Sequence, residues 1–222
     1  NSRPSLNVTV KIVAPEELID KQIYTGTFIP DEEVNLTFES SGKITKIFFQ
    51  EGSFVKKGML LAKVNDGPLQ AELKKLEAQI PLAEDRVYRQ SALLEKDAVS
   101  KEAYEQVTTE LEKLHADIEL AKARIAQTEL RAPFDGMIGL RQVSEGNYAS
   151  PTTIIATLTK ISPLKIECAV SEKHANNVKP GTPITFTTTE SGDLNTYYAK
   201  VYAVESRIDL NTRTKKVRAI YP

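Results

Sequence analysis

Two segments of this 222-residue chain carry the same pattern, and they lie far apart. Residues 42–52 and 136–146 both open with Gly-x-Ile and close with Glu-Gly, with the final glycine ten residues after the first. In the same register, each copy ends in an apolar run, at residues 60–64 and 154–158, that is long enough for a strand. The repeat predicts a β-fold made of two similar halves that an insertion separates.

The insertion has the pattern of a coiled coil. Two series of apolar residues recur at alternating spacings of four and three, which places each series along one stripe of a helix. We call these two stripes the seam. The first series is Leu69, Leu73, Leu76, Ile80, Ala83 and Val87, and the second is Val107, Leu111, Leu114, Ile118, Ala121 and Ile125. Because only a short break separates the two helices, they are predicted to pair as an antiparallel hairpin.

The break between the helices lies near residues 96–100. Asp97 or Ser100 can cap the second helix, and Glu102 favours the positive end of that helix. Two helices of about 28 residues, at 1.5 Å per residue, project about 40 Å from the β-fold. Pro81 lies inside the first helix, where it is expected to kink the helix or leave a carbonyl unpaired.

Further strands flank the repeat on both sides. Alternating apolar residues predict one strand around Val8 to Ile12 and another from Ile23 to Phe28. After residue 160, strands are expected at residues 164–170, 184–189, 197–204 and 214–220, with a short helix at 171–178. Since the chain stops at this fourth strand, we expect it to be a fragment of a longer protein whose last β-domain is incomplete here.

Composition and charge exclude several classes of function. Lys and Arg number 29 against 30 Asp and Glu, so the formal net charge is −1. The chain as a whole therefore has no excess positive charge that would attract nucleic acid. The single cysteine, Cys168, lies in an alternating strand pattern and is interpreted as a structural thiol. The sequence contains no apolar run long enough to cross a membrane and no signal peptide at Asn1, so any targeting segment is expected to be absent from this chain.

No constellation of catalytic or metal-binding residues is evident. His115 and His174 are far apart and make no zinc pattern, and the two methionines lie in the strand repeats and do not suggest a copper site. Asp135 and Glu145 are interpreted as turn residues and not as an acid pair for catalysis. The chain is therefore predicted to be no enzyme, with no catalytic residue, cofactor or metal.

The two β-halves, with their Glu-Gly turns, resemble the halves of a lipoyl or biotinyl carrier domain. In those carriers an exposed lysine at the hairpin tip between the halves forms an amide with the cofactor. Here that position falls near Asp66-Gly67, where the chain departs into the helical insertion. A carrier component of a multienzyme complex remains an alternative, as does a scaffold whose coiled coil forms a parallel dimer.

A lipoyl-like domain split by a helical hairpin and followed by a β-barrel resembles the periplasmic adaptors, or membrane fusion proteins, of Gram-negative efflux pumps. The resemblance implies a mixed α and β, elongated and modular fold with the following division. Residues 1–17 belong to a partial membrane-proximal domain, 18–33 and 161–222 to an incomplete β-barrel, 34–66 and 128–160 to the lipoyl-like domain, and 67–127 to the hairpin.

Adaptors of the resistance-nodulation-division (RND) type carry Arg, Leu and Ser at the hairpin tip, with Leu four residues after Arg and Ser seven after Leu. Arg89, Leu93 and Ser100 have this spacing. The resemblance implies that they dock on an outer-membrane channel: Arg89 would donate to carbonyls or a carboxylate, Leu93 would make apolar contact and Ser100 would hydrogen-bond. The alternatives are that Arg89 is a solvated flank of the coiled coil and Ser100 is merely an N-cap.

The function implied is a non-enzymatic adaptor of a multidrug efflux pump. It would bridge an inner-membrane RND transporter to an outer-membrane channel, in the periplasm, anchored to the inner membrane by a lipid or an N-terminal segment that this chain lacks. The resemblance also implies self-association into a ring, expected as a hexamer built as a trimer of dimers, with no nucleic-acid partner. An adaptor of an ATP-driven exporter is the alternative within the same architecture.

Overall fold

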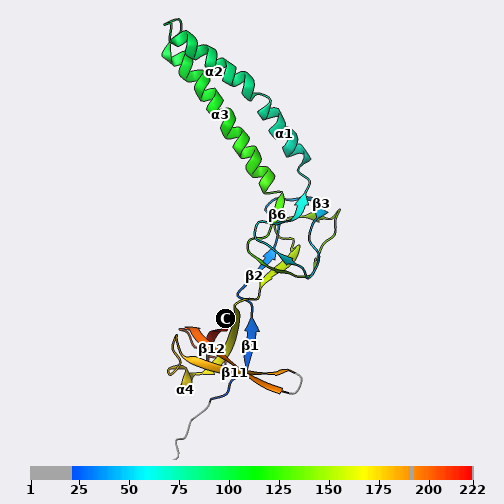
Figure 1. Cartoon of the computed structure of the whole chain (residues 1–222), viewed down its shortest axis with the longest axis vertical. Helices are drawn as coiled ribbons and strands as arrows, with labels where there is room; N and C mark the ends of the chain where they lie inside the picture. The colour runs from blue at the N-terminus through cyan, green and yellow to red at the C-terminus, as the bar shows by residue number, and fades with distance from the viewer. Residues whose placement is uncertain (1–21, 191–192, 222) are drawn as a thin grey trace, which may run out of the picture.

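The computed structural model describes residues 22–190 and 193–221. Figure 1 shows three parts in a row: a long helical hairpin, a small β-module at its base, and a second β-module beyond it. The prediction of an elongated, modular fold with mixed helix and strand is thus confirmed. The strand expected around Val8 to Ile12 lies outside the described residues.

The β-module at the base of the hairpin consists of two four-stranded antiparallel sheets. One sheet has the order β2 (Glu32–Leu36), β9 (Ala156–Lys160), β7 (Gly136–Ile138) and β4 (Phe54–Val55), and the other β6 (Glu129–Arg131), β5 (Leu60–Val64), β3 (Gly42–Ile47) and β8 (Tyr148–Ala149). Each sheet therefore takes two strands from each copy of the sequence repeat. Neither copy contains a complete sheet of its own.

The register of the strands shows that the two copies are related by an approximate two-fold symmetry. Ile44 pairs with Val64 in the first copy, and Ile138 pairs with Leu158 at the equivalent positions of the second. Between the copies, Gly42 pairs with Ala149 where Gly136 pairs with Val55. The inward side chains of both sheets form one continuous core that includes Phe38, Ile44, Leu61, Ile138, Ile155 and Leu158.

The hairpin contains three helices, α1 (Gly67–Glu77), α2 (Ile80–Leu94) and α3 (Lys101–Ala126), with α1 and α2 both running along α3. All twelve residues of the seam are buried or partly buried, as the spacing predicts. Arg124 of α3 contacts Glu72 of α1 across the pair, with 4.0 Å between Nη1 and Oε1. The first and second helical segments are separated at Ala78-Gln79, just before Pro81, where proline has no amide hydrogen to continue the ladder.

The second β-module is a five-stranded antiparallel sheet. Its order is β1 (Gly26–Ile29), β10 (Leu164–Ser171), β13 (Thr214–Tyr221), β12 (Asp193–Val204) and β11 (Pro183–Glu190). The rings of Phe28 on β1 and Phe186 on β11 meet edge to face with centroids 5.6 Å apart, so the sheet curls until its two edge strands approach each other. The helix expected at residues 171–178 is shorter, α4 (Glu172–Ala175), and ends in turns with i→i+3 hydrogen bonds.

Asp31 joins the two β-modules at the point where both connecting segments pass. Its carboxylate accepts from Lys160, at the end of β9, and from Lys165, at the start of β10, with N–O distances of 2.8 Å for both. The Asp31 amide also donates to the Lys160 carbonyl at 2.8 Å. One side chain therefore fastens both connections between the modules.

Candidate docking site at the hairpin tip

The tip of the hairpin is a tight turn closed on the carbonyl of Leu93. That carbonyl accepts from the amide of Lys96 at 3.2 Å and from the amide of Ala98 at 2.9 Å. Asp97 has a left-handed backbone, with φ of 52°, as the residue after a helix often does in such a turn. The turn fixes the direction in which α2 ends, and so the place of Leu93.

Ser100 begins the return helix as its N-cap. Its backbone is extended, and its Oγ accepts a hydrogen bond from the amide of Ala103 at 3.2 Å. Glu102 lies in the first turn, where a negative charge favours the positive end of the helix dipole. The sequence offered Asp97 or Ser100 as the N-cap of the second helix. In the structure Ser100 is the N-cap, and Asp97 lies in the turn before it. The hydroxyl hydrogen of Ser100 remains available to donate outward.

Arg89 and Leu93 lie on consecutive turns of α2 and lead to the tip. The Arg89 guanidinium donates to the carboxylate of Asp85 one turn earlier, and both side chains are more than half exposed. An exposed ion pair of this kind contributes little and can exchange partners readily. Leu93 is 42% exposed although it is apolar and belongs to a helix with a well-formed seam.

The three residues near the tip offer a cation, an apolar side chain and a hydroxyl within two helical turns of the turn that joins α2 and α3. This set can bind a surface that presents carboxylates or free carbonyls beside an apolar patch, as the ends of helices do. Two exposed side chains on α2 were not singled out from the sequence, Leu82 at 55% exposure and Tyr88 at 73%. The sequence pattern could have indicated their exposure, because both residues lie next to seam positions and not on them.

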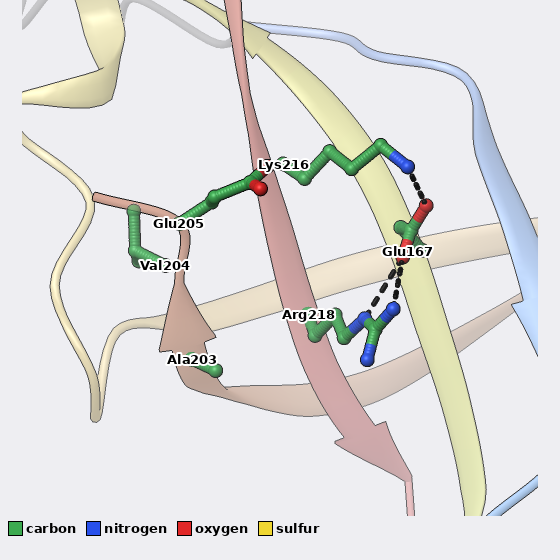
Figure 2. Close-up of a pocket in the computed structure, with 6 residues that line it drawn as sticks. All are labelled: Glu167, Ala203, Val204, Glu205, Lys216 and Arg218. Atoms are coloured by element: carbon green, nitrogen blue, oxygen red, sulfur yellow. Dashed lines mark hydrogen bonds and ion pairs between the residues drawn. The ribbon is translucent and has the colours of Figure 1, made fainter. Parts of the chain in front are cut away.

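The hollow drawn in Figure 2 lies on the outer face of the five-stranded sheet and is a structural feature. It measures about 330 Å³, and its cations are already engaged. Glu167 accepts from Lys216 at 3.1 Å and from Arg218 at 2.8 Å, which links β10 to β13. The Arg218 guanidinium, with Lys216, holds the pKa of the Glu167 carboxyl below its usual range. Both cations that line this hollow are therefore committed to Glu167.

The position where a carrier domain holds its cofactor lysine is occupied here by the start of the hairpin. Helix α1 begins at Gly67, and the nearby Lys63 pairs with Asp66 at 2.8 Å. Across residues 22–190 and 193–221, no three His, Cys, Asp or Glu side chains gather where they could hold a metal. In the same part of the chain, no helix is both long enough and apolar enough to span a bilayer.

Comparison with known proteins agrees with this architecture, which is that of an efflux adaptor. The family model described as the barrel-sandwich hybrid domain of RND membrane fusion proteins matches residues 32–160, more than half of the chain. The chain therefore belongs to the family of RND-type membrane fusion proteins, the adaptors of efflux pumps.

Individual relatives support the same family. The multidrug resistance protein MdtA of Proteus mirabilis is 25% identical over 99% of this chain and 58% of its own length, and an uncharacterized protein of Haemophilus influenzae is 28% identical over 96% and 56%. The chain thus spans little more than half the length of these curated relatives. A crystal structure of a MacA–MexA chimera, which contains the Pseudomonas aeruginosa MexA α-hairpin, superposes with a TM-score of 0.79 at 27% identity, covering 89% of this chain and 72% of that one.

Proposed function

We propose that this protein is the periplasmic adaptor subunit of a multidrug efflux pump, bridging an inner-membrane RND transporter to an outer-membrane channel and helping to seal the conduit between them. The observation that carries the proposal is the hairpin tip, where an apolar side chain stays exposed at the far end of a projecting arm. The role is interfacial and needs no catalytic group. The match to an RND-type family model favours an RND transporter over an ATP-driven exporter as the partner.

The docking site on the channel side is Arg89, Leu93 and Ser100. Leu93 supplies apolar area that is exposed in the free chain and would be buried in the joint. Arg89 exchanges its exposed pairing with Asp85 for a carboxylate or carbonyl of the channel. Ser100 keeps its oxygen on the Ala103 amide and donates its hydrogen across the joint.

Self-association into a ring, a hexamer made as a trimer of dimers, completes the conduit. An apolar patch on the β-sandwich supports this part of the proposal. Phe54 and Met137 pair across β4 and β7, and with Ile161 they line a hollow of about 330 Å³ on the outer face of their sheet. Their exposures are 63%, 40% and 53%. At the equivalent positions of the other half, Lys43 replaces Met137 and Tyr148 replaces Phe54, so the two sheets differ in surface chemistry.

The location proposed is the periplasm, with anchoring to the inner membrane through a lipid or an N-terminal segment. The domain division proposed from the sequence is consistent with the elements described: residues 34–66 and 128–160 carry most of the two sandwich sheets, 67–127 the helices, and 18–33 and 161–222 the five-stranded sheet. Residues 1–17 are assigned to a membrane-proximal domain by the resemblance alone.

The docking proposal is tested by placing a charge on the exposed leucine of the tip. Leu93→Asp in the full-length protein should sensitise cells to exported drugs as much as deletion of the protein does, because a carboxylate would be desolvated in the joint. Leu210→Asp is the matched control, since Leu210 is 86% exposed and lies in the other β-module. Normal resistance with Leu93→Asp, at an unchanged protein level, contradicts the docking role.

The carrier alternative has a direct test of its own. Mass spectrometry of the protein purified from its native cells should give the mass of the unmodified polypeptide, apart from its anchor. A lipoyl or biotinyl adduct on any lysine would contradict the adaptor proposal in favour of a carrier function.

A further inference from the structure

A polar side chain continues the seam next to the hairpin tip. The alternating spacing of three and four residues runs on from Val87 to Gln90 and then to Leu94, the last residue of α2. Gln90 is partly buried, as the residues of the seam on α2 are, whereas its neighbour Arg89 is exposed. Since α2 packs along α3, Gln90 lies on the side of α2 that faces α3.

The amide group of Gln90 is not satisfied in this position. Its Oε1 is the one buried side-chain oxygen or nitrogen without a hydrogen-bond partner in the part of the chain that the structure describes. Burying an acceptor without a donor destabilises a structure, because the acceptor loses its hydrogen bonds to water and gains none in return. This penalty applies only while the two helices are closed around the amide. The closed tip is therefore less stable than it would be with an apolar side chain at this position.

The first turns of α3, which lie beside the end of α2, are also a weak part of their helix. Three β-branched residues follow one another at 107–109, and such residues favour helix less than straight-chain residues do. The hydroxyls of Thr108 and Thr109 donate to the carbonyls of Tyr104 and Glu105, four residues earlier, at 3.0 Å and 2.8 Å. Hydrogen bonds of this kind slightly destabilise a helix. Both helices are thus weakened near the tip.

The base of the hairpin is more firmly packed than the tip. Ile118, Ala121 and Ile125, in the half of α3 nearer the β-sandwich, are only 6%, 2% and 9% exposed. Helix α2, which the structure describes along its whole length, contains no residue buried to this degree. Just beyond α3, the carbonyl of Thr128 accepts from the amide of Val64 at 3.0 Å, which fastens the base to the sandwich. The stability of the helix pair therefore falls from the base to the tip.

We propose that the last turns of the hairpin, residues 90–104, are built to open locally when the tip docks, and that Gln90 is the residue that keeps their closed form weak. Opening separates the end of α2 from the start of α3. It frees the amide of Gln90 and adds the apolar area of Leu94 to that of Leu93, which is exposed already. This inference deepens the proposed docking on a channel and rests on it.

A channel shifts the tip toward its open form only if it binds that form better than the closed one. The open tip offers two additional interactions: the Oε1 of Gln90 can accept from a backbone amide, and Leu94 supplies apolar area to bury. Helices that end together in a turn present free carbonyls at one helix end and free amides at the other. The partner that the open tip fits is therefore a helical hairpin end, with amides for Gln90 beside carbonyls for Arg89.

Hydrogen exchange of the full-length adaptor, without its channel, tests the opening itself. Gln90→Met keeps a similar side-chain size but removes the polar atoms, so the amides of residues 90–95 and 104–107 should exchange at least about fivefold more slowly. The amides report the opening because single helix ends this short are unstable once separated. Gln90→Glu adds a charge that closing would bury, and the same amides should exchange faster.

The matched control for exchange is Gln106→Met, at an exposed position of α3 near the same level. It should change the exchange of these amides by less than about twofold, because surface substitutions have small effects. Exchange in Gln90→Met that is as fast as in the unchanged protein would overturn the proposal, since Gln90 would then have no control over the tip.

Drug susceptibility of cells tests whether the opening is used in docking. Gln90→Met should lower resistance several-fold at an unchanged protein level, although its hairpin is the more stable one, whereas Gln106→Met should leave resistance normal. A merely structural role for Gln90 predicts full resistance from a stabilising substitution. Normal resistance with Gln90→Met, despite slower exchange, would overturn the proposal. It would leave docking through Leu93 standing, because Leu93→Asp tests that contact separately.

Discussion

At the residue scale, the observed N-cap role of Ser100 is compatible with the docking role proposed for it. Its Oγ caps α3 by accepting from the Ala103 amide, and the proposed docking uses only its hydroxyl hydrogen. The capping role could be predicted from local sequence, since serine followed by acidic residues is typical of a helix start. The pairing of Arg89 with Asp85 could not be selected in advance, because an exposed arginine with several acidic neighbours has many rotamers of similar energy.

Two substitutions separate the roles of Ser100. Ser100→Ala should lower the free energy of unfolding by about 1 kcal/mol, because the Ala103 amide loses its acceptor. Ser100→Asp should leave stability nearly unchanged, since aspartate caps as well as serine, yet it should impair efflux because it has no hydroxyl to donate. Denaturant unfolding and drug susceptibility measure the two effects. Full efflux activity of Ser100→Asp would show that the serine serves only as a cap.

At the element scale, the glutamates of the repeated Glu-Gly turns have a role beyond the turn. Glu145 Oε1 accepts from the amide of Ile47, and Glu51 Oε1 accepts from the amide of Arg141, each at 2.9 Å. The two bonds occupy equivalent positions, so the glutamate of each half holds a backbone amide of the other half. The sequence predicted the turns, but it could not predict these crossing bonds because they depend on the exchange of strands between the halves. Gly52 and Gly146 turn the chain there with φ of 72° and 90°.

The crossing bonds predict matched costs for two distant substitutions. Glu51→Ala and Glu145→Ala should each lower the free energy of unfolding by about 1 kcal/mol, because each leaves one backbone amide without its acceptor. Glu39→Ala, at an exposed position without such a bond, is the control and should change stability by less than about 0.5 kcal/mol. Denaturant unfolding measures all three. A cost at only one of the two turns would contradict the symmetry.

The helical elements were predictable in most respects from their spacing. Every seam residue that was predicted is shielded in the structure, because the pattern of four and three is a direct consequence of helix geometry. The separation of α1 from α2 was anticipated as a kink at Pro81, and it falls at Ala78-Gln79, before the proline. The aromatic contact of Phe28 with Phe186 was not foreseen, since it joins strands more than 150 residues apart through the curl of the sheet.

At the scale of the whole molecule, the geometry between the two β-modules depends on Asp31. Hydrogen bonds from Lys160 and Lys165 hold the pKa of this carboxyl below its usual range. A carboxyl whose pKa is lowered by folding stabilises the fold above its ordinary pKa of 3.8, and this stabilisation is lost as the pH falls through the lowered value. The sequence could not predict the two ion pairs of Asp31, because nothing in the spacing of Asp31, Lys160 and Lys165 requires the two connections between the modules to meet.

The ion pairs of Asp31 predict that the melting temperatures of two variants depend differently on pH. Asp31→Asn should lower the melting temperature at neutral pH, because both ion pairs lose their anion. The deficit should shrink as the pH falls below the ordinary pKa of aspartate, where the native carboxyl also becomes neutral. Glu33→Gln, at a neighbouring exposed site with no ion pair, is the control. Calorimetry over a pH series measures this, and a deficit that stays constant down to the most acidic pH contradicts the account.

The molecule as a whole is a rod whose far tip is the proposed contact with another protein. The symmetric β-sandwich and the filled seam fix the direction of the hairpin, and Leu93 remains exposed where the rod ends. The family assignment makes the chain an efflux adaptor, and the tip determines how it would meet a channel. We therefore propose that Leu93 touches the helical end of an outer-membrane channel.

Site-specific disulfide formation in cells tests that claim most directly. The full-length protein, with Cys168→Ser and Leu93→Cys, is produced with its transporter and with a channel that carries one cysteine at its periplasmic helical tip. We predict a disulfide between adaptor and channel, and none when the cysteine is introduced as Leu210→Cys in the remote β-module. A pump that still exports its substrates while no disulfide forms from position 93 to any residue of the channel tip would contradict the account.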